Sequence, residues 1–238
     1  MGYAVQVTNN ISYGPKSLNK LNVYLPQGTS GVRRAVLVIH GGYFTQGSKD
    51  DPRFVALSKS LASAGFVAVN INYRLLNSTV KWPAPLSDSQ LAVRFTRSKA
   101  ASWNIDPNTV IAYGWSAGAH LASLMSSKAV AEGDQASRLP SYASRVQRAV
   151  MVSGLYNNPG DSIDPFLFID ANTSPTYIVT GNNDRYCPVS RSQDYYDRLV
   201  ALGVSAVMEV YAGGHVWQGA SASERAAIEA RVRAWLAL

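Results

Sequence analysis

The stretch that decides the fold of this chain reads Ile111-Ala112-Tyr113-Gly114-Trp115-Ser116-Ala117-Gly118-Ala119-His120-Leu121. An apolar, strand-like segment is followed by Gly-x-Ser-x-Gly and then by small residues typical of a helix start. Glycine is needed on both sides of the serine because the turn from strand to helix is so tight that a Cβ would clash there. The stretch therefore predicts a nucleophile elbow, in which the Ser116 hydroxyl projects over the edge of a sheet.

The remainder of the chain offers the groups that activate a serine, whose hydroxyl is by itself a poor nucleophile. His215 follows a strand-like segment at 204–211, and we expect it to be the base. Asp184 follows another apolar segment, at 175–180, and we expect it to orient His215. The resulting chain order of serine, aspartate and histidine is the one that the elbow fold requires. Three other acids stay open as alternatives to Asp184: Asp161, Asp164 and Glu209.

Backbone donors for a developing oxyanion are predicted from a glycine pair near the N-terminus. Residues 35–39 are all apolar and read as a buried parallel strand that ends at His40-Gly41-Gly42. Glycines let backbone N–H groups approach a substrate oxygen closely. The N–H groups of Gly41, Gly42 and Ala117 are therefore expected to form an oxyanion hole, in which each donor stabilises the transition state by about 3 kcal/mol.

Motifs along nearly the whole chain resemble those of the α/β-hydrolase esterases related to hormone-sensitive lipase. The matching segments are His40-Gly41-Gly42, Asn72-Tyr73-Arg74-Leu75, Trp82-Pro83-Ala84-Pro85-Leu86-Ser87-Asp88, Gly114-Trp115-Ser116-Ala117-Gly118 and Gly181-Asn182-Asn183-Asp184. The resemblance implies the same triad, Ser116, Asp184 and His215, and the same oxyanion hole. Tyr43 and Ala119 stand where the family usually has glycine. The bulky Tyr43 narrows the mouth beside the oxyanion hole and bears on the size of the acyl group.

Strand-like and helix-like patterns alternate along the chain, as the crossovers of a parallel sheet require. Strands are expected at 3–8, 21–25, 35–39, 66–71, 109–113, 148–152, 175–180 and 204–211, and helices at 52–64, 86–101, 116–129, 188–202 and 220–237. With 238 residues, 47% of them hydrophobic, the chain is long enough for one sizeable core. We expect a single domain over residues 1–238 with an α/β-hydrolase fold, an eight-stranded, mostly parallel sheet flanked by helices without an N-terminal cap.

Composition excludes several other classes of function. The net charge is +7, but the 22 basic residues are scattered, and groups such as Arg94, Arg97 and Lys99 read as the solvated face of a surface helix rather than a nucleic-acid site. The chain lacks the roughly 18 consecutive apolar residues of a membrane span and the pattern of a signal peptide, so a cytoplasmic location is expected. The lone Cys187 allows no internal disulfide and is read as a small thiol rather than a second nucleophile.

Cofactor sites are not expected, because the three histidines lie far apart in the sequence and no spacing typical of metal ligands occurs. His40 is expected to fix its own loop through backbone hydrogen bonds. His120 lies four residues after Ser116 and is expected to be a hydrogen-bonded structural residue. Ser87 or Asp88 is expected to cap a helix.

Substrate contacts are expected from aromatic side chains next to the motifs. Tyr43, Phe44, Trp115 and Trp217 either form an aromatic pocket or pack the core beneath the loops. The candidate covers for the cleft are two segments, 133–144 and 153–174. An open cleft favours short acyl esters over triglycerides because it offers little apolar surface to a long chain.

The function expected from these residues is that of a serine carboxylesterase acting on small short-chain acyl esters, with acetyl or feruloyl esters of plant polysaccharides as plausible substrates. An amide hydrolase of the arylformamidase type is an alternative, although such relatives have His-Gly-Gly-x-Trp where this chain has Phe44. A ligand-binding receptor on the same fold is a second alternative. The presence of both Ser116 and His215 argues against a receptor.

Overall fold

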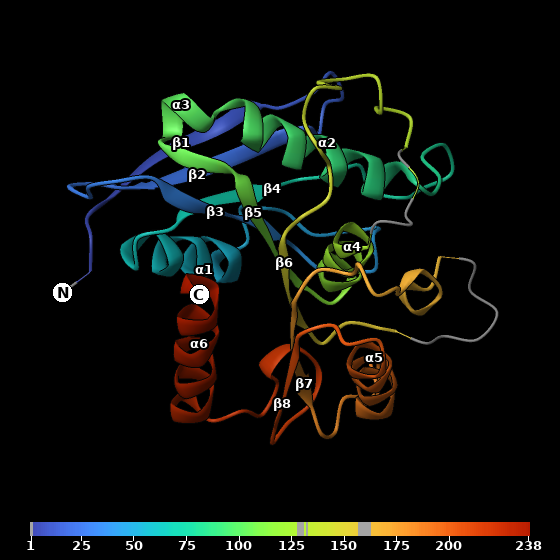
Figure 1. The fold of residues 1–238 in the computed structure, drawn as a ribbon. Coiled ribbons are helices and arrows are strands. Elements are labelled where there is room, and N and C mark those ends of the chain that lie inside the picture. The colour runs from blue at the N-terminus through green and yellow to red at the C-terminus, as the bar shows by residue number, and fades with distance from the viewer. Residues whose placement is uncertain (1, 128–130, 132, 157–162) are drawn as a thin grey trace.

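The computed structural model describes residues 2–127, 131, 133–156 and 163–238. Within these residues lies an eight-stranded sheet with the order β1-β2-β4-β3-β5-β6-β7-β8 (Figure 1). Its strands are β1 (Val5–Ser12), β2 (Lys20–Pro26), β3 (Arg33–Ile39), β4 (Val67–Ile71), β5 (Ile105–Trp115), β6 (Arg148–Val152), β7 (Thr176–Gly181) and β8 (Ala206–Tyr211). β2 pairs antiparallel with β1 and β4, and every other pair is parallel. The expected α/β-hydrolase sheet is confirmed.

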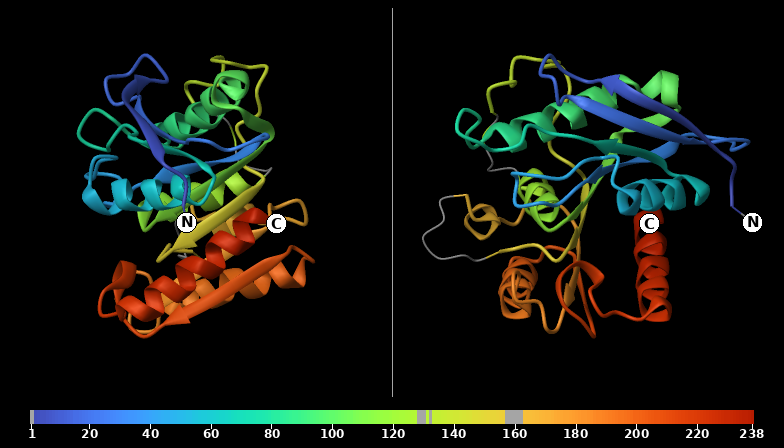
Figure 2. Two further views of the ribbon diagram at one scale, coloured as in Figure 1. Left: turned by 90° about the vertical axis from the view of Figure 1, so that its left-hand side faces the viewer. Right: turned by 180° about the vertical axis from the view of Figure 1, so that it is seen from behind.

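Helices cover both faces of this sheet. They are α1 (Pro52–Ser63), α2 (Ala84–Ser98), α3 (Ala100–Trp103), α4 (Ala117–Ser126), α5 (Val189–Ala201) and α6 (Ala222–Ala237), with short 3₁₀ turns η1 (Pro165–Phe168) and η2 (His215–Trp217). Alternate residues of β3 explain the two layers: Val36 and Val38 pack with α1 and α6, whereas Leu37 and Ile39 pack with α2, α4 and α5. The left view of Figure 2 shows α6, in red, in front of the last strands of the sheet.

Side chains cap the starts of two of the helices, α1 and α6. The Asp51 side chain caps α1 by accepting from the N–H of Arg53, and Ser221 caps α6 by accepting from the N–H of Glu224. The expectation that Ser87 or Asp88 caps a helix is wrong. α2 already begins at Ala84, so both residues lie inside it, and buried Asp88 forms an ion pair of 2.7 Å with Arg74.

The segment 133–144 packs on α2 and does not cover the predicted catalytic cleft. Arg94 and Arg97 on α2 are 2% and 5% exposed, and they donate to the carbonyl oxygens of Gln135 and Ala143. The expectation of a solvated face at these two arginines is therefore wrong. Both guanidinium groups form charge-assisted hydrogen bonds with backbone carbonyl oxygens of the loop 133–144 instead of facing solvent.

Parallel strand pairing brings the predicted site residues to one edge. Ile39 at the end of β3 lies opposite Gly114 on β5, and Gly181 at the end of β7 lies opposite Tyr211 on β8. The segments that follow these strands carry all the candidate catalytic groups. Ligand sites of parallel sheets form at this carboxyl edge.

In the described part of the chain, none of the helices combines the length and the apolar character that a membrane span requires.

Candidate active site

Ser116 lies at the sharp turn between β5 and α4. Its backbone has φ 54° and ψ −118°, a strained conformation for a residue with a side chain. A Cβ at Gly114 would lie 2.0 Å from the carbonyl oxygen of Gly118, and a Cβ at Gly118 would lie 2.1 Å from that of Ile39. Only glycine fits at both positions, which is the sterically tight elbow that the sequence predicts.

Ser116, His215 and Asp184 are joined by two hydrogen bonds. The Nε2 atom of His215 is 2.9 Å from Ser116 Oγ, and its Nδ1 atom is 2.8 Å from Asp184 Oδ2. The buried carboxylate accepts a hydrogen bond from the Nδ1–H of His215, which leaves Nε2 unprotonated and able to accept the serine proton. Burial raises the pKa of Asp184, but hydrogen bonds from His215 and from the N–H groups of Cys187 and Tyr186 outweigh it, so this pKa lies below its ordinary value. The carboxylate is therefore charged at neutral pH.

The alternative acids have other partners or positions. Glu209 forms an ion pair with Arg231 and accepts a hydrogen bond from Tyr177. Asp164 accepts from the N–H of Phe166 and caps η1. Asp161 lies outside the described residues. Asp184 is the acid that the structure places beside His215.

A tyrosine hydroxyl holds the backbone of the loop that carries His215. Tyr211 Oη donates to the carbonyl oxygen of Gly214 at 2.6 Å and accepts from the N–H of Trp217 at 2.8 Å. Ser153 Oγ accepts from the N–H of the residue after His215 at 3.0 Å. The two residues after His215 have φ of 47° and 67°, a left-handed conformation that persists only when its surroundings hold it. Tyr211 and Ser153 are therefore positioning residues for His215.

Removing the Tyr211 hydroxyl is expected to misplace His215. In Tyr211→Phe we expect kcat to fall roughly 10- to 100-fold with little change in KM, because a small displacement of a catalytic group costs about that much. Steady-state kinetics on 4-nitrophenyl acetate measures it. Tyr177→Phe is the matched control, since it also removes a tyrosine hydroxyl from the sheet but one bonded to Glu209. Equal kcat in the two variants would show that the Tyr211 hydroxyl serves stability alone.

Two of the predicted oxyanion donors, Gly41 and Ala117, lie next to Ser116. A Cβ at Gly41 would be 3.0 Å from Ser116 Cβ, so the backbone of this glycine passes directly beside the nucleophile. Ala117 is the first residue of α4, where N–H groups lack helical partners. Among the described residues, none accepts a hydrogen bond from the N–H groups of Gly41, Gly42 or Ala117. These groups are available to a substrate oxygen.

Tyr43 occupies a glycine-like conformation. Its φ is 54°, in the region that favours glycine. This agrees with the sequence comparison, in which the esterase family that the chain resembles usually has a third glycine at this position. Its side chain is 58% exposed and contacts Tyr186 edge to face, with ring centroids 6.1 Å apart. The two tyrosines stand at the entrance to the site.

A small apolar cavity of about 130 Å³ opens beside the Ser116 hydroxyl. It is lined by Tyr43, Phe44, Ser116, Ala117, His120, Leu155, Ile163, Tyr186 and Cys187. Leu155 and Ile163 belong to the segment 153–174, which the sequence predicts as a candidate cover for the cleft. The cavity also includes Tyr43 and Phe44, which were expected to contact substrate.

The other two aromatic residues predicted as substrate contacts lie in the core instead. Trp115 is 1% exposed and packs against Phe54 of α1, with ring centroids 4.9 Å apart. Trp217 is 6% exposed and stacks on Tyr211 at 4.8 Å. Neither side chain lines the cavity, because both point to the face of the sheet covered by α1 and α6. The structure therefore corrects the prediction that Trp115 and Trp217 contact the substrate.

Two further histidines are structural. Burial lowers the pKa of His40 to about 4, so its neutral ring donates from Nδ1 to the carbonyl oxygen of Gly41. His120 donates from Nε2 to the carbonyl oxygen of Ile163 at 3.0 Å and lies edge-on to Phe44. The sequence indicated its structural role but not its position in the cavity wall, although its spacing of four residues from Ser116 placed it on the same helix face.

One group of described residues has the atoms of a metal site. The ligand atoms of Asp184, Cys187 and His215 lie within 4.8 Å of one another. Burial, together with the neighbouring Asp184 carboxylate, raises the pKa of the Cys187 thiol to about 12, whereas a metal needs the thiolate. Both carboxylate oxygens of Asp184 already accept hydrogen bonds. The hydrogen bonds of this group fit a histidine base oriented by a carboxylate better than a metal site.

This fold, with Ser116, His215 and Asp184 joined by hydrogen bonds at the strand ends, is that of an α/β-hydrolase. Residues 21–157 match the family BD-FAE, and residues 101–217 match the family described as serine hydrolase (FSH1). The chain belongs to the BD-FAE family. The resemblance to esterases that its motifs indicate is confirmed.

Named relatives agree with this class. Esterase LipQ of Mycobacterium tuberculosis is 27% identical over 239 residues, which cover 86% of this chain and 55% of that protein. An acetylxylan esterase of Xylanibacter ruminicola is 27% identical over 226 residues, covering 89% of this chain and 45% of that protein. The chain spans about half the length of these curated relatives. A truncated carbohydrate esterase from gut microbiota shares the fold, with a TM-score of 0.79, 24% identity and 90% of each chain covered.

Proposed function

We propose that the protein is a serine carboxylesterase that hydrolyses short-chain acyl esters through an acyl-enzyme. The observation that carries the proposal is the 2.9 Å contact between Ser116 Oγ and His215 Nε2 at a strained elbow. His215 takes the serine proton as Oγ attacks the ester carbonyl, and Asp184 stabilises the imidazolium that forms. The N–H groups of Gly41, Gly42 and Ala117 hold the oxyanion. His215 then protonates the departing alcohol. In the second half of the reaction His215 takes a proton from water, the water attacks the acyl-enzyme, and the proton returns to Ser116 Oγ as the acid leaves.

The substrate is a small ester of a carboxylic acid. Acetyl esters fit the proposal best, because the cavity beside Ser116 has only about 130 Å³. This volume is well below the roughly 300–1,000 Å³ of sites for drug-sized ligands, so the space suits a small acyl group. The acetylxylan esterase among the relatives supports acetylated plant polysaccharides as a source of such esters. A feruloyl group is much larger and would have to extend past Tyr43 and Tyr186 at the entrance.

The wider setting belongs to the same proposal. We infer a single domain over residues 1–238 that acts on its ester without nucleic acid. A cytoplasmic location is favoured by the presence of just one cysteine, since disulfides are typical of exported proteins.

Acyl-chain length gives a direct test of the small cavity. We expect kcat/KM on 4-nitrophenyl esters to peak between acetyl and butyryl and to fall steeply by octanoyl. A methylene outside the cavity gains little of the about 0.8 kcal/mol that burial provides. A series from acetate to palmitate measures this. Tyr43→Gly should move the optimum towards longer chains, since it opens the cavity at a position whose φ suits glycine.

A peak at decanoyl or longer, or activation by emulsified triglyceride, would contradict the proposal of a small acyl cavity. Such a result would mean that the segment 153–174 acts as a lid. N-formylkynurenine and methyl ferulate, assayed beside the series, separate the arylformamidase alternative and the feruloyl substrate from acetyl esters. Turnover of N-formylkynurenine well above that of every ester would replace the proposal by amide hydrolysis. Binding of the esters without any turnover would favour the receptor alternative.

A further inference from the structure

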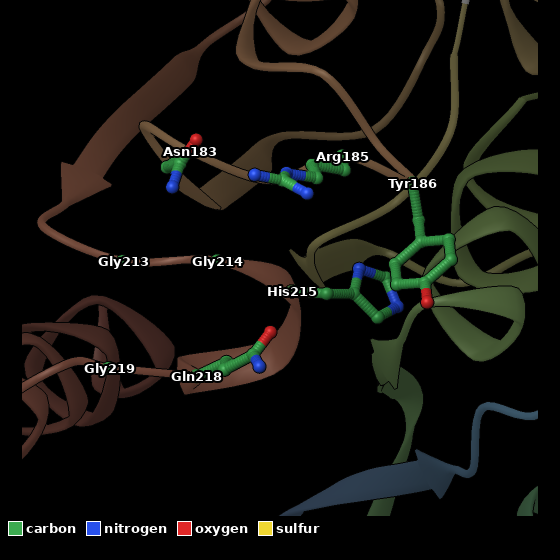
Figure 3. Close-up of a pocket in the computed structure, with 8 residues that line it drawn as sticks. All are labelled: Asn183, Arg185, Tyr186, Gly213, Gly214, His215, Gln218 and Gly219. Carbon is green, nitrogen blue, oxygen red and sulfur yellow. The ribbon is translucent and has the colours of Figure 1, made fainter.

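A second, larger cavity borders His215, and we call it the polar cavity because more polar side chains line it than line the first. It has about 570 Å³, within the range of small-molecule sites. Its side chains come from two loops, Asn183, Arg185 and Tyr186 after β7 and His215 and Gln218 after β8. Figure 3 shows Arg185 and Gln218 on opposite sides of the Gly213–Gly214 backbone, with His215 at its end. Tyr186 lines both cavities, so the two meet at the catalytic residues.

The proposed reaction assigns the two cavities to the two halves of an ester. The carbonyl carbon must lie at Ser116, which lines the apolar cavity but not the polar one. The alcohol oxygen must lie beside His215, since this ring protonates the departing alcohol. His215 lines the polar cavity and not the apolar one. The acyl group is therefore placed in the small cavity and the alcohol in the large one, an assignment that rests on the proposed function.

Charge in the polar cavity points to the kind of alcohol. Arg185 is exposed and has no ion-pair partner among the described residues, in contrast to Arg53, Arg74, Arg225 and Arg231. Its neighbour Asp184 is fully buried, and both of its oxygens are occupied by other donors, so it does not pair with this guanidinium. None of the residues that line the cavity is acidic. The guanidinium is free to bind an anion from solution.

Two hydrogen-bonding side chains line the same cavity as this charge. The exposed Asn183 and Gln218 carry amides, each of which both donates and accepts hydrogen bonds. Glycines at 213, 214 and 219 leave the floor without side chains. A planar guanidinium binds a carboxylate or phosphate through two parallel hydrogen bonds. Amides in the same cavity suit several hydroxyl groups.

We propose that this cavity is the subsite for the alcohol, and that it selects polyhydroxy alcohols bearing an anionic group held by Arg185. The shared chemistry is a sugar-like alcohol with a carboxylate or a phosphate. Asn183 and Gln218 bind its hydroxyl groups, and Arg185 sets its orientation relative to His215.

Three acetates with the same sugar ring test this selection. All are glucose derivatives acetylated at oxygen 3, and they differ at carbon 6, which carries a hydroxyl, a carboxylate or a phosphate. We expect kcat/KM to be about tenfold higher for an anionic acetate than for the neutral one, the effect of a charge-assisted hydrogen bond at an open site. The carboxylate and phosphate arms identify which anion fits. The preference should shrink between 0.1 M and 1 M salt because salt screens exposed charges.

Arg185→Gln is the decisive variant and is expected to bring the ratio between anionic and neutral acetates close to one. Arg198→Gln is the matched control, because it removes the same charge from an exposed position on α5 outside the cavity. It should keep the ratio. No preference in the unaltered protein, or a preference that survives in Arg185→Gln, would overturn the proposal.

Binding to an inactive variant separates this proposal from the proposed function. Ser116→Ala should bind the methyl glycoside of glucuronic acid about tenfold more tightly than that of glucose, as titration calorimetry or NMR would measure, because the ion pair is independent of turnover. Equal binding of the two glycosides overturns the subsite even when 4-nitrophenyl acetate is hydrolysed. Tighter binding of the anionic glycoside sustains the subsite even when no ester is hydrolysed, in which case the esterase proposal alone fails.

Discussion

Replacing Ser116 by alanine is expected to lower kcat on 4-nitrophenyl acetate by a factor on the order of 10⁴ or more, because the mechanism has no substitute for its nucleophile. The fold should persist, since alanine keeps the Cβ that already accommodates the strained elbow. Activity assays together with circular dichroism and thermal unfolding measure both effects.

Ser123→Ala is the matched control for this substitution. Ser123 is buried on the same helix and donates to the carbonyl oxygen of His120, three residues before it. Its loss should leave kcat largely unchanged. Substantial turnover in folded Ser116→Ala, or an equal loss in both variants, would contradict the assignment of Ser116.

Asp184→Asn is expected to reduce kcat by roughly 10²- to 10⁴-fold, because an amide no longer fixes the tautomer of His215 or stabilises its charged form.

The pKa of Asp184 is lowered in the folded protein, so its ionisation favours folding above the ordinary aspartate pKa. That contribution is lost as the pH falls through the lowered pKa. The loss of kcat should therefore appear at neutral pH, where the carboxylate is charged.

Glu209→Gln serves as the control for Asp184→Asn, since Glu209 is bound to Arg231 and Tyr177. It should retain its turnover while losing some stability. Full activity in Asp184→Asn would transfer the role of the acid to Asp161, Asp164 or Glu209. His215→Ala separates the base in the same assay, and a larger loss in folded His120→Ala would show that the base is misassigned.

Local sequence signals were sufficient for the sheet and for the order of the catalytic groups. The elbow at Ser116 is a steric requirement of neighbouring glycines, and each catalytic loop directly follows an apolar strand. Because these strands run parallel, the loops that follow them all lie at one edge of the sheet. Strand ends differ by a few residues from expectation, for example at β1, which runs over Val5–Ser12.

Long-range packing accounts for what the sequence did not predict. Trp115 shares a sheet face with Ile111 and Tyr113, so its contact is with α1 and not with the cavity, despite its place beside Ser116. Arg94 and Arg97 are buried only because a segment about 40 residues further along the chain lies over them. The hydrophobic pattern of a helix cannot predict that a distant segment packs against it.

The polar cavity was missed for a similar reason. Arg185 and Gln218 stand more than 30 residues apart in the sequence, in two loops that meet only at the sheet edge. Arg185 alone reads as one exposed arginine among many. Its lack of an acidic partner among the described residues becomes visible only in three dimensions.

Covalent labelling tests most directly whether Ser116 is an activated nucleophile. The protein is treated with a fluorophosphonate, which reacts with activated serines, then digested and mapped by mass spectrometry. The account predicts a single adduct, located on Ser116, absent from Ser116→Ala and formed far more slowly in His215→Ala. An adduct on a different serine, or no adduct on Ser116 in the folded protein, would contradict it.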